Sequence, residues 1–195
     1  MNINAYSPQI IIGACVVVLL VILVIAWGVI RQRNSKRREN LRLKFGPEYD
    51  AAVLQYGSRH KAEMALEARL RRVEKFELRP LTAAERSRYM ADWDSVQARF
   101  VDHPRSAVTE ADELVNSVLA KRGYPNGTVE QRASDISVHH SRLVDPYRRA
   151  YAVTAKAGKN EATTEELRSA MILYRALFED LMQSKPVVMR QAQAA

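Results

Sequence analysis

Hydrophobic and polar positions divide the chain into one long apolar run and a series of amphipathic segments. The run from Ile10 to Ile30 is 21 consecutive residues without a charged side chain. As an α-helix it is about 30 Å long, the thickness of the hydrocarbon core of a bilayer. The pattern predicts a transmembrane helix at 10–30, preceded by a short extracytoplasmic tail at 1–9.

From residue 45 to 183 the apolar residues recur at spacings of three and four, the period of a helix with one buried face. Capping boxes, in which a Thr and a Glu or Gln three residues later satisfy helix-end backbone groups, begin at Thr82, Thr128 and Thr163. Ser58 is a further candidate cap. Glycine and proline mark the ends. Helices are therefore predicted at about 48–56, 59–79, 83–100, 105–122, 129–135, 142–157 and from 164 onward.

The apolar stripes agree with these limits. In the predicted helix after Ser58 the stripe is Met64, Leu66, Leu70 and Val73, and in the next one it is Tyr89, Trp93, Val96 and Phe100. A short link at 101–104 predicts an antiparallel hairpin between this helix and the following one. The last helix has the clearest stripe: Leu167, Ala170, Met171, Tyr174, Leu177, Phe178 and Leu181. The aromatic residues on these stripes are interpreted as core.

No strand-like alternation occurs after the apolar run. The fold class is thus all-α: one N-terminal transmembrane helix followed by a helical-hairpin or bundle-like domain of six or seven helices at 45–183. Residues 184–195 are small and polar and predict a flexible tail.

The formal charge of +8 is concentrated behind the apolar run. Residues 31–44 hold seven Lys/Arg and one Glu, whereas residues 45–195 hold 23 basic and 21 acidic residues. This basic juxtamembrane segment predicts contact with anionic lipid headgroups rather than with nucleic acid. The predicted headgroup contacts are Arg31, Arg33, Lys36, Arg37 and Arg38.

The charge asymmetry also predicts topology. The first nine residues carry no charged side chain and the positive cluster follows the run. We expect the N-terminus outside and the domain in the cytoplasm. A cleaved signal or a reversed segment is the alternative. The only cysteine, Cys15, lies inside the run, so no intramolecular disulfide can form.

Motifs for common chemistry are missing from the soluble part. It has neither GxxxxGK[ST] nor GxGxxG, and no GxSxG. No cofactor and no metal are expected, because adjacent His139 and His140 point in different directions on a helix. Asp135 and His139 share a face only if the helix is continuous there. The acidic residues of the predicted hairpin are interpreted as a solvated face: Asp92, Asp94, Asp102, Glu110, Asp112 and Glu113.

Four residues in predicted loops or short elements are candidates for a partner surface, because loops carry recognition more often than cores. These are Arg122, Tyr124, Arg132 and Asp135. The alternative is structural: Tyr124 packs back onto the domain and Arg132 pairs with a nearby acid.

Six short motifs stand out along the domain: FGPEYD (45–50), RPLTAAER (79–86), the run from Trp93 to Pro104, RGYP (122–125), EQRASDIS (130–137) and YRRAY (147–151). Together they resemble an uncharacterised family of bacterial proteins with one N-terminal membrane span and a helical domain. The resemblance covers about residues 40–182. It implies a bacterial origin and a membrane anchor, and it implies no activity. Residues 138–141 depart from the pattern, where an acidic residue and a proline are expected.

Three functions are compatible with these features. The first is a non-enzymatic protein of the bacterial inner membrane, whose cytoplasmic domain binds an unknown protein partner or acts as a scaffold. The second is a membrane-tethered enzyme that uses Asp135, His139 and His140. The third is a nucleic-acid-binding module held at the membrane. The sequence predicts no oligomeric state, since Gly13 and Gly28 are too far apart for a GxxxG pairing face.

Overall fold

A computed structural model describes residues 8–183, and over this range it consists of helices and connecting loops without a strand. The predicted all-α fold class is confirmed. The chain divides into two compact units between residues 43 and 44. The predicted tail at 184–195 and residues 1–7 of the predicted N-terminal tail lie outside the described residues.

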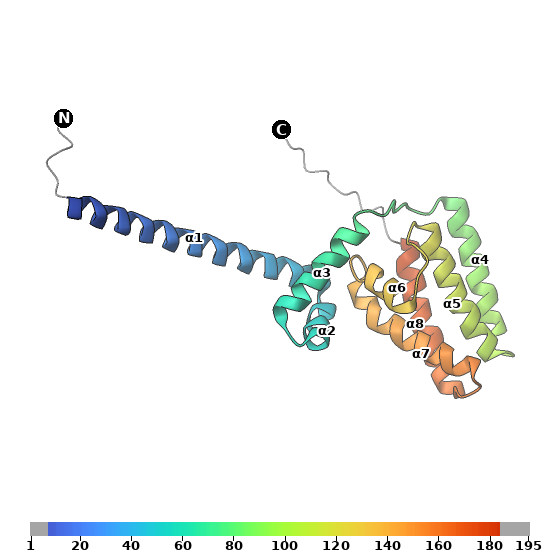
Figure 1. Ribbon diagram of the computed structural model, residues 1–195. Helices are drawn as coiled ribbons and strands as arrows, with labels where there is room; N and C mark the ends of the chain where they lie inside the picture. Colours follow the sequence, from blue (N-terminus) through green and yellow to red (C-terminus); the bar gives the residue numbers. More distant parts are fainter. Residues whose placement is uncertain (1–7, 184–195) are drawn as a thin grey trace. The chain divides into compact units, whose positions relative to one another are not determined.

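The first unit is built on α1 (Pro8–Phe45), one continuous helix of 38 residues (Figure 1). Its large apolar side chains from Val18 to Ile25 are each more than half exposed. Within the described residues, α1 is the one helix long and apolar enough to cross a membrane, judged by length and composition. The helix continues through the basic residues, because nothing before Gly46 interrupts it.

The second unit contains the remaining helices. These are α2 (Pro47–Tyr56), α3 (Arg59–Val73), α4 (Ala83–Arg99), α5 (Pro104–Lys121), α6 (Val129–Ile136), the 3₁₀ helix η2 (Ser141–Leu143), α7 (Val144–Gly158) and α8 (Thr164–Gln183). The seven α-helices of this part agree with the predicted six or seven.

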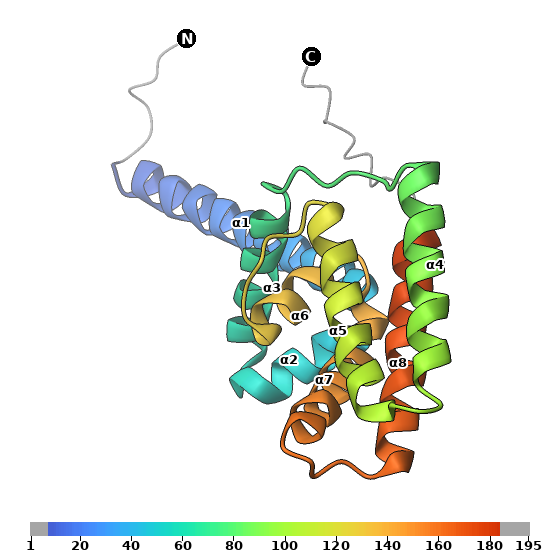
Figure 2. The ribbon, with the colours of Figure 1, turned by 90° about the vertical axis from the view of Figure 1, so that its right-hand side faces the viewer.

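A bundle of α4, α5, α7 and α8 forms the main core, in which α5 contacts the other three. Figure 2 shows α4, α5 and α8 side by side. Trp93 on α4 stacks on Phe178 of α8 with ring centroids 4.8 Å apart. Tyr174 and Phe178 are fully buried, as predicted, and Tyr89 and Phe100 are partly buried against this core. The α4–α5 hairpin is confirmed.

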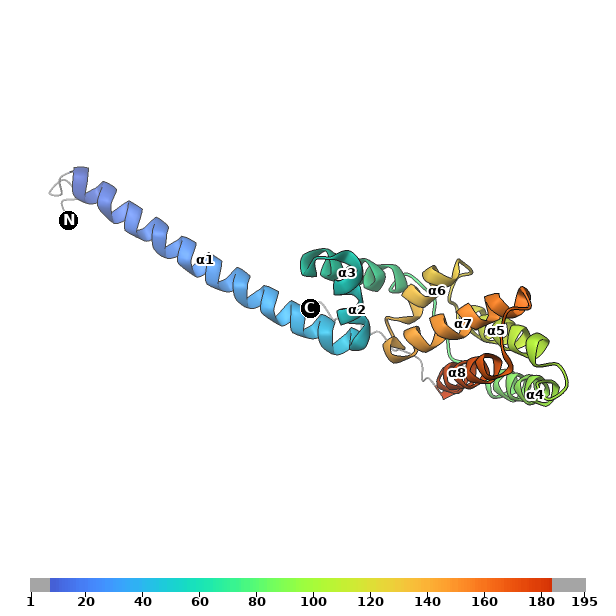
Figure 3. The same cartoon turned by 90° about the horizontal axis from the view of Figure 1, so that it is seen from below.

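A smaller hairpin of α2 and α3 (Figures 1 and 3) contacts the bundle through η2 and α6. Here the predicted stripe is wrong in two ways. Met64 is 54% exposed, and Arg69 joins Ala62, Leu66 and Val73 on the buried face. The reason is that Arg69 finds a buried acidic partner. The helix also ends at Val73, seven residues before Pro80, and an irregular linker follows.

The predicted helix caps are confirmed to different extents. Thr82 with Glu85 and Thr163 with Glu166 each form the complete reciprocal box. Thr128 accepts a hydrogen bond from the Gln131 backbone, but the Gln131 side chain turns to Asp135 instead of returning to the cap. Ser58 precedes α3 without a side-chain cap bond.

Candidate functional site

The predicted partner surface is mostly interior. Arg122 and Tyr124 are each 5% exposed and Asp135 is 1% exposed, while Arg132 is partly buried. Arg132 donates from Nε to the hydroxyl of Tyr147 at 2.9 Å and from Nη1 to a backbone carbonyl. The four residues therefore do not form a free surface. Arg122 and Tyr124 are buried because the loop after α5 folds back against α8 and the α3–α4 linker. Arg132 and Asp135 lie on α6 and face α7 and α3.

Arg122 joins three segments at the end of α5. Its Nη1 donates to the carbonyl of Leu181 in the last turn of α8 at 2.6 Å. Its own carbonyl accepts from the Arg79 backbone in the linker at 3.0 Å. The next residue, Gly123, has φ +96°, and a Cβ there would collide with the backbone carbonyl of Glu77. The linker and the loop after α5 therefore pack backbone to backbone.

Tyr124 follows Gly123 in the loop after α5 and links this loop to the segment after α6. Its hydroxyl is 3.3 Å from Nδ1 of His139, and its ring meets Phe76 of the linker edge to face. Burial raises the pKa of Tyr124 to about 12. Burial, with the nearby charges of His140, Lys44 and Arg122, lowers the pKa of His139 to about 4. At neutral pH both side chains are uncharged.

His140 points away from its neighbour and pairs with Asp180 on α8. The rings of His139 and His140 lie 6.5 Å apart at 75°, in keeping with the predicted divergence. Burial lowers the pKa of His140, although the Asp180 carboxylate acts in the opposite direction. This pair fastens the segment after α6 to the last helix.

Asp135 belongs to a different set of contacts. Its Oδ1 accepts from Nε of Arg72 at 3.0 Å and from the Gln131 amide at 2.9 Å, while the described side chains offer its buried Oδ2 no partner. The helix ends at Ile136, so the continuous helix needed to align Asp135 with His139 is not present. Within residues 8–183, no group of three His, Cys, Asp or Glu is arranged to hold a metal ion.

A second polar chain, missed by the sequence analysis, runs through the bundle between α5, α6, α7 and α8. At its centre the Asp112 carboxylate accepts from the Tyr174 hydroxyl at 3.1 Å and from the Asn116 amide at 3.0 Å. Burial raises the pKa of Asp112. The hydrogen-bonded order is Arg132, Tyr147, Asn116, Asp112, Tyr174 and Thr154.

The assignment of Asp112 to a solvated face is wrong. The signal that could have found it is its spacing, because Asp112 is four residues after Val108 and three before Val115 on one helix face. An acid on an apolar stripe needs buried partners. Here they come from Tyr174, 62 positions away, and from Asn116.

A third polar group joins the α2–α3 hairpin to α7, and it was also missed. Glu48 is buried, and its two carboxylate oxygens accept from Arg69 at 2.7 Å and from Arg148 at 3.3 Å. Arg148 also reaches the exposed Glu130 on α6. Glu48 lies in the FGPEYD motif and Arg148 in the YRRAY motif, so the junction connects two of the six motifs.

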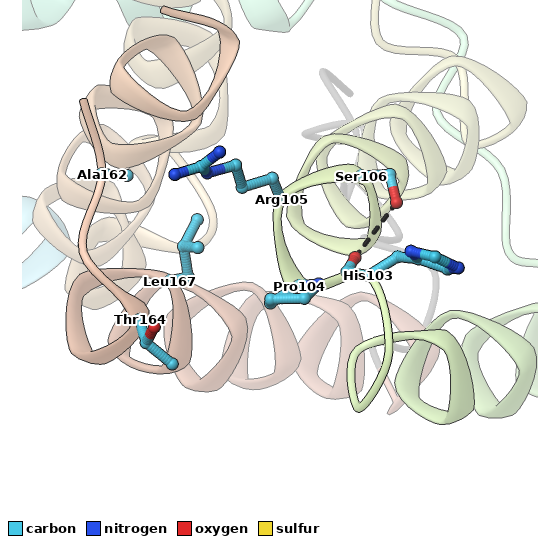
Figure 4. Close-up of a pocket in the computed structure, with 7 residues that line it drawn as sticks. All are labelled: His103, Pro104, Arg105, Ser106, Ala162, Thr164 and Leu167. Atoms are coloured by element: carbon cyan, nitrogen blue, oxygen red, sulfur yellow. Dashed lines mark hydrogen bonds between the residues drawn. The ribbon is translucent and has the colours of Figure 1, made fainter. Parts of the chain in front are cut away.

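One cavity of about 420 Å³ lies between the start of α5 and the start of α8 (Figure 4). In the figure Arg105 extends toward Ala162, while His103 and Ser106 lie on the other side of the first turn of α5. Arg105 donates to the Asn160 side chain at 3.0 Å. The residues that line the cavity are His103, Pro104, Arg105, Ser106, Ala162, Thr164 and Leu167. None of the predicted candidate residues lines this cavity.

Taken together, the polar groups hold helices to one another. Each of Arg122, Arg132, Asp135 and His140 contacts a helix other than its own, which is the arrangement of structural connectors. No protein-family model matches the chain, and neither the curated proteins nor the solved structures searched give a match. The resemblance carried by the six motifs therefore stays a prediction.

Proposed function

We propose that the protein is a single-pass protein of the bacterial inner membrane, with a helical cytoplasmic domain that acts as a non-enzymatic interaction or scaffold module. The observation that carries the anchor is the exposure of α1. Eight consecutive apolar residues from Val18 to Ile25 are more than half exposed, so every face of the helix is apolar and uncovered. A helix that is apolar on all sides needs a protein core or a bilayer around it.

The arrangement of charge along α1 supports a spanning helix over one lying flat on a surface. A surface helix separates apolar and basic residues onto two faces. In α1 they are separated along the axis instead, because at 100° per residue Arg31, Arg38 and Arg42 lie opposite Arg33 and Arg37. A ring of basic residues around the axis suits a helix that passes through the headgroup layer.

Trp27 and Arg31 mark the expected cytoplasmic boundary. The Arg31 guanidinium lies 5.4 Å from the centre of the Trp27 ring, a cation–π contact one helical turn apart. Tryptophan prefers the membrane–water interface, and basic residues prefer the cytoplasmic side. With five basic residues among 31–38, this supports an N-terminus outside, a domain in the cytoplasm and contact with anionic headgroups.

The scaffold role is supported by the contacts within the domain. Asp135, His139 and His140, the residues of the enzyme alternative, bind Arg72, Tyr124 and Asp180. Side chains engaged in this way serve stability more directly than they serve a substrate. The nucleic-acid alternative has less support, because residues 45–195 carry 23 basic and 21 acidic side chains.

Crosslinking in native membranes, followed by capture of the full-length protein, tests the scaffold role. We expect a reproducible protein partner that is lost when residues 44–195 are replaced by an unrelated helical domain behind the same anchor. Capture of the same proteins by the anchor alone would contradict an interaction role for the domain.

A further inference from the structure

The tip of the α2–α3 hairpin, residues 54–61, differs from the rest of the domain surface. Six large hydrophobic residues of the described second unit are exposed, and three of them lie within eleven residues of this hairpin: Leu54, Tyr56 and Met64. Leu54 is 84% exposed. The other three are spread over α4, the α4–α5 turn and α8. Half of the exposed large hydrophobic residues of the described second unit therefore lie on this one hairpin.

The charged residues of the tip itself are basic, and the exposed acid Asp50 lies one turn before Leu54 on α2. Residues 51–62 contain no acidic residue, whereas Arg59, His60 and Lys61 follow the turn and are all exposed. The nearest acid on α3, Glu63, accepts a hydrogen bond from Tyr49 at 2.8 Å. Exposed leucine and tyrosine beside basic side chains form the combination that enters the headgroup region of an anionic bilayer.

The hairpin is held as a rigid element. Gly57 closes the turn with φ +63°, a conformation that glycine adopts without strain. Glu48 ties α2 to Arg69 of α3 and to Arg148 of α7. The tip is therefore already ordered by its two helices. Docking it costs little conformational entropy, because few additional residues have to become ordered.

The chain length permits a return to the membrane. The basic segment 31–44 is about 21 Å long as a helix, and α2 adds about 15 Å between Gly46 and the tip. The two lengths differ by about 6 Å, so chain length alone does not keep the tip from the headgroup layer.

We propose that the α2–α3 tip, formed by Leu54, Tyr56, Arg59, His60 and Lys61, docks on the anionic surface of the bilayer that α1 crosses. This inference rests on the proposed membrane anchor. It gives the domain a second membrane contact, which restricts its rotation and directs the opposite end of the bundle, with the α4–α5 turn, toward the cytoplasm.

The test uses the full-length protein in nanodiscs, with Cys15→Ala as background and a nitroxide label on Leu54→Cys. Val101→Cys, on the α4–α5 turn, is the matched control because Val101 is 82% exposed. Accessibility to oxygen, which partitions into lipid, is compared with accessibility to a water-soluble nickel chelate. In discs containing phosphatidylglycerol we expect the oxygen-to-nickel ratio to be several-fold higher at residue 54 than at residue 101.

Arg59→Gln with Lys61→Gln is expected to lower the ratio at residue 54 toward the control value. Arg88→Gln with Arg149→Gln, which removes two exposed charges from α4 and α7, is expected to leave it unchanged. Equal ratios at residues 54 and 101 overturn the inference. It is also overturned if the label at residue 54 is shielded from the nickel chelate in detergent to the same extent as in discs, because a protein interface then covers it. If the protein fails to stay in the disc, the membrane anchor itself is wrong.

Discussion

At the residue scale, Glu48 shows how a buried charge depends on its partners. Its carboxylate is held between Arg69 and Arg148, and removing the negative charge leaves two arginines without their shared partner. We expect Glu48→Gln to lower the free energy of unfolding by about 3 kcal/mol. Urea unfolding of the full-length protein, followed by circular dichroism, measures this difference.

Glu130→Gln is the control, because Glu130 contacts the same Arg148 from an exposed position. An exposed ion pair contributes about 1 kcal/mol or less. Equal losses in the two variants would show that the buried junction has no special role.

Gly123 is the glycine that the fold requires most. It combines φ +96° with close approach to the Glu77 backbone. Gly123→Ala is expected to cost about 2 kcal/mol or more, since both the left-handed backbone and the contact disfavour a Cβ. In the control Gly158→Ala the Cβ meets nothing within 4 Å, so stability should stay equal or rise by up to about 1 kcal/mol. A similar melting temperature for both variants would contradict this reading of the linker contact.

His139 makes stability depend on pH in a defined direction. Its pKa falls from 6.5 in the unfolded chain to about 4 in the folded protein. Between these values the unfolded chain binds the proton more readily, so stability is full above pH 6.5 and declines as the pH falls toward 4. Neutral His140 acts in the same direction.

His139→Gln should therefore weaken the decline in the urea midpoint between pH 7 and pH 5. His60→Gln, at an exposed position, is the control and should preserve the decline. If the urea midpoint of His139→Gln depends on pH as steeply as that of the unchanged protein, His139 is equally accessible to protons in the folded and unfolded states.

These residues also show the limit of sequence reasoning. Trp93, Tyr174 and Phe178 were predicted to be core because each lies on a local stripe. Asp112 and Glu48 were not recognised as buried, because their partners Tyr174 and Arg148 are 62 and 100 positions away. Local spacing predicts which face of a helix is buried, but it does not predict which distant polar residues pair.

At the element scale, helix starts were predicted well where a side chain closes the first turn. Thr82 accepts from the Glu85 backbone at 3.2 Å, whereas Ser58 makes no such bond. Thr82→Ala is expected to cost about 1 kcal/mol, and Ser58→Ala only a few tenths. Thermal unfolding separates the two, and a loss at Ser58 equal to that at Thr82 would contradict the cap assignment.

One predicted helix end is wrong because tertiary contacts decide it. α3 stops at Val73 although Pro80 is the first breaker, since the linker has to pass the loop after α5 at Gly123. One helix start also differs, because α7 begins at Val144 behind the 3₁₀ turn Ser141–Leu143 and not at residue 142. This turn shares Ser141 with the stretch 138–141, where the motifs depart from the family pattern. Both differences follow from packing that no local motif encodes.

At the scale of the whole molecule, the separation of charge explains the apparent basicity of the chain. Seven Lys/Arg and one Glu follow the apolar run directly, while residues 45–195 are nearly neutral. The sequence predicted the long apolar helix and the all-α fold class, because both depend on composition and period. The burial of Arg122, Tyr124 and Asp135 could not be predicted from the sequence, since it depends on the packed fold.

The central claim is that α1 crosses the inner membrane with the domain on the cytoplasmic side. Protease treatment of intact spheroplasts tests it most directly, with one epitope tag before Met1 and another after Ala195. We predict that the N-terminal tag is removed, that residues 44–183 and the C-terminal tag stay protected until the membrane is permeabilised, and that alkaline carbonate does not extract the protein. Digestion of the domain in intact spheroplasts, or release of the whole chain by carbonate, would contradict the account.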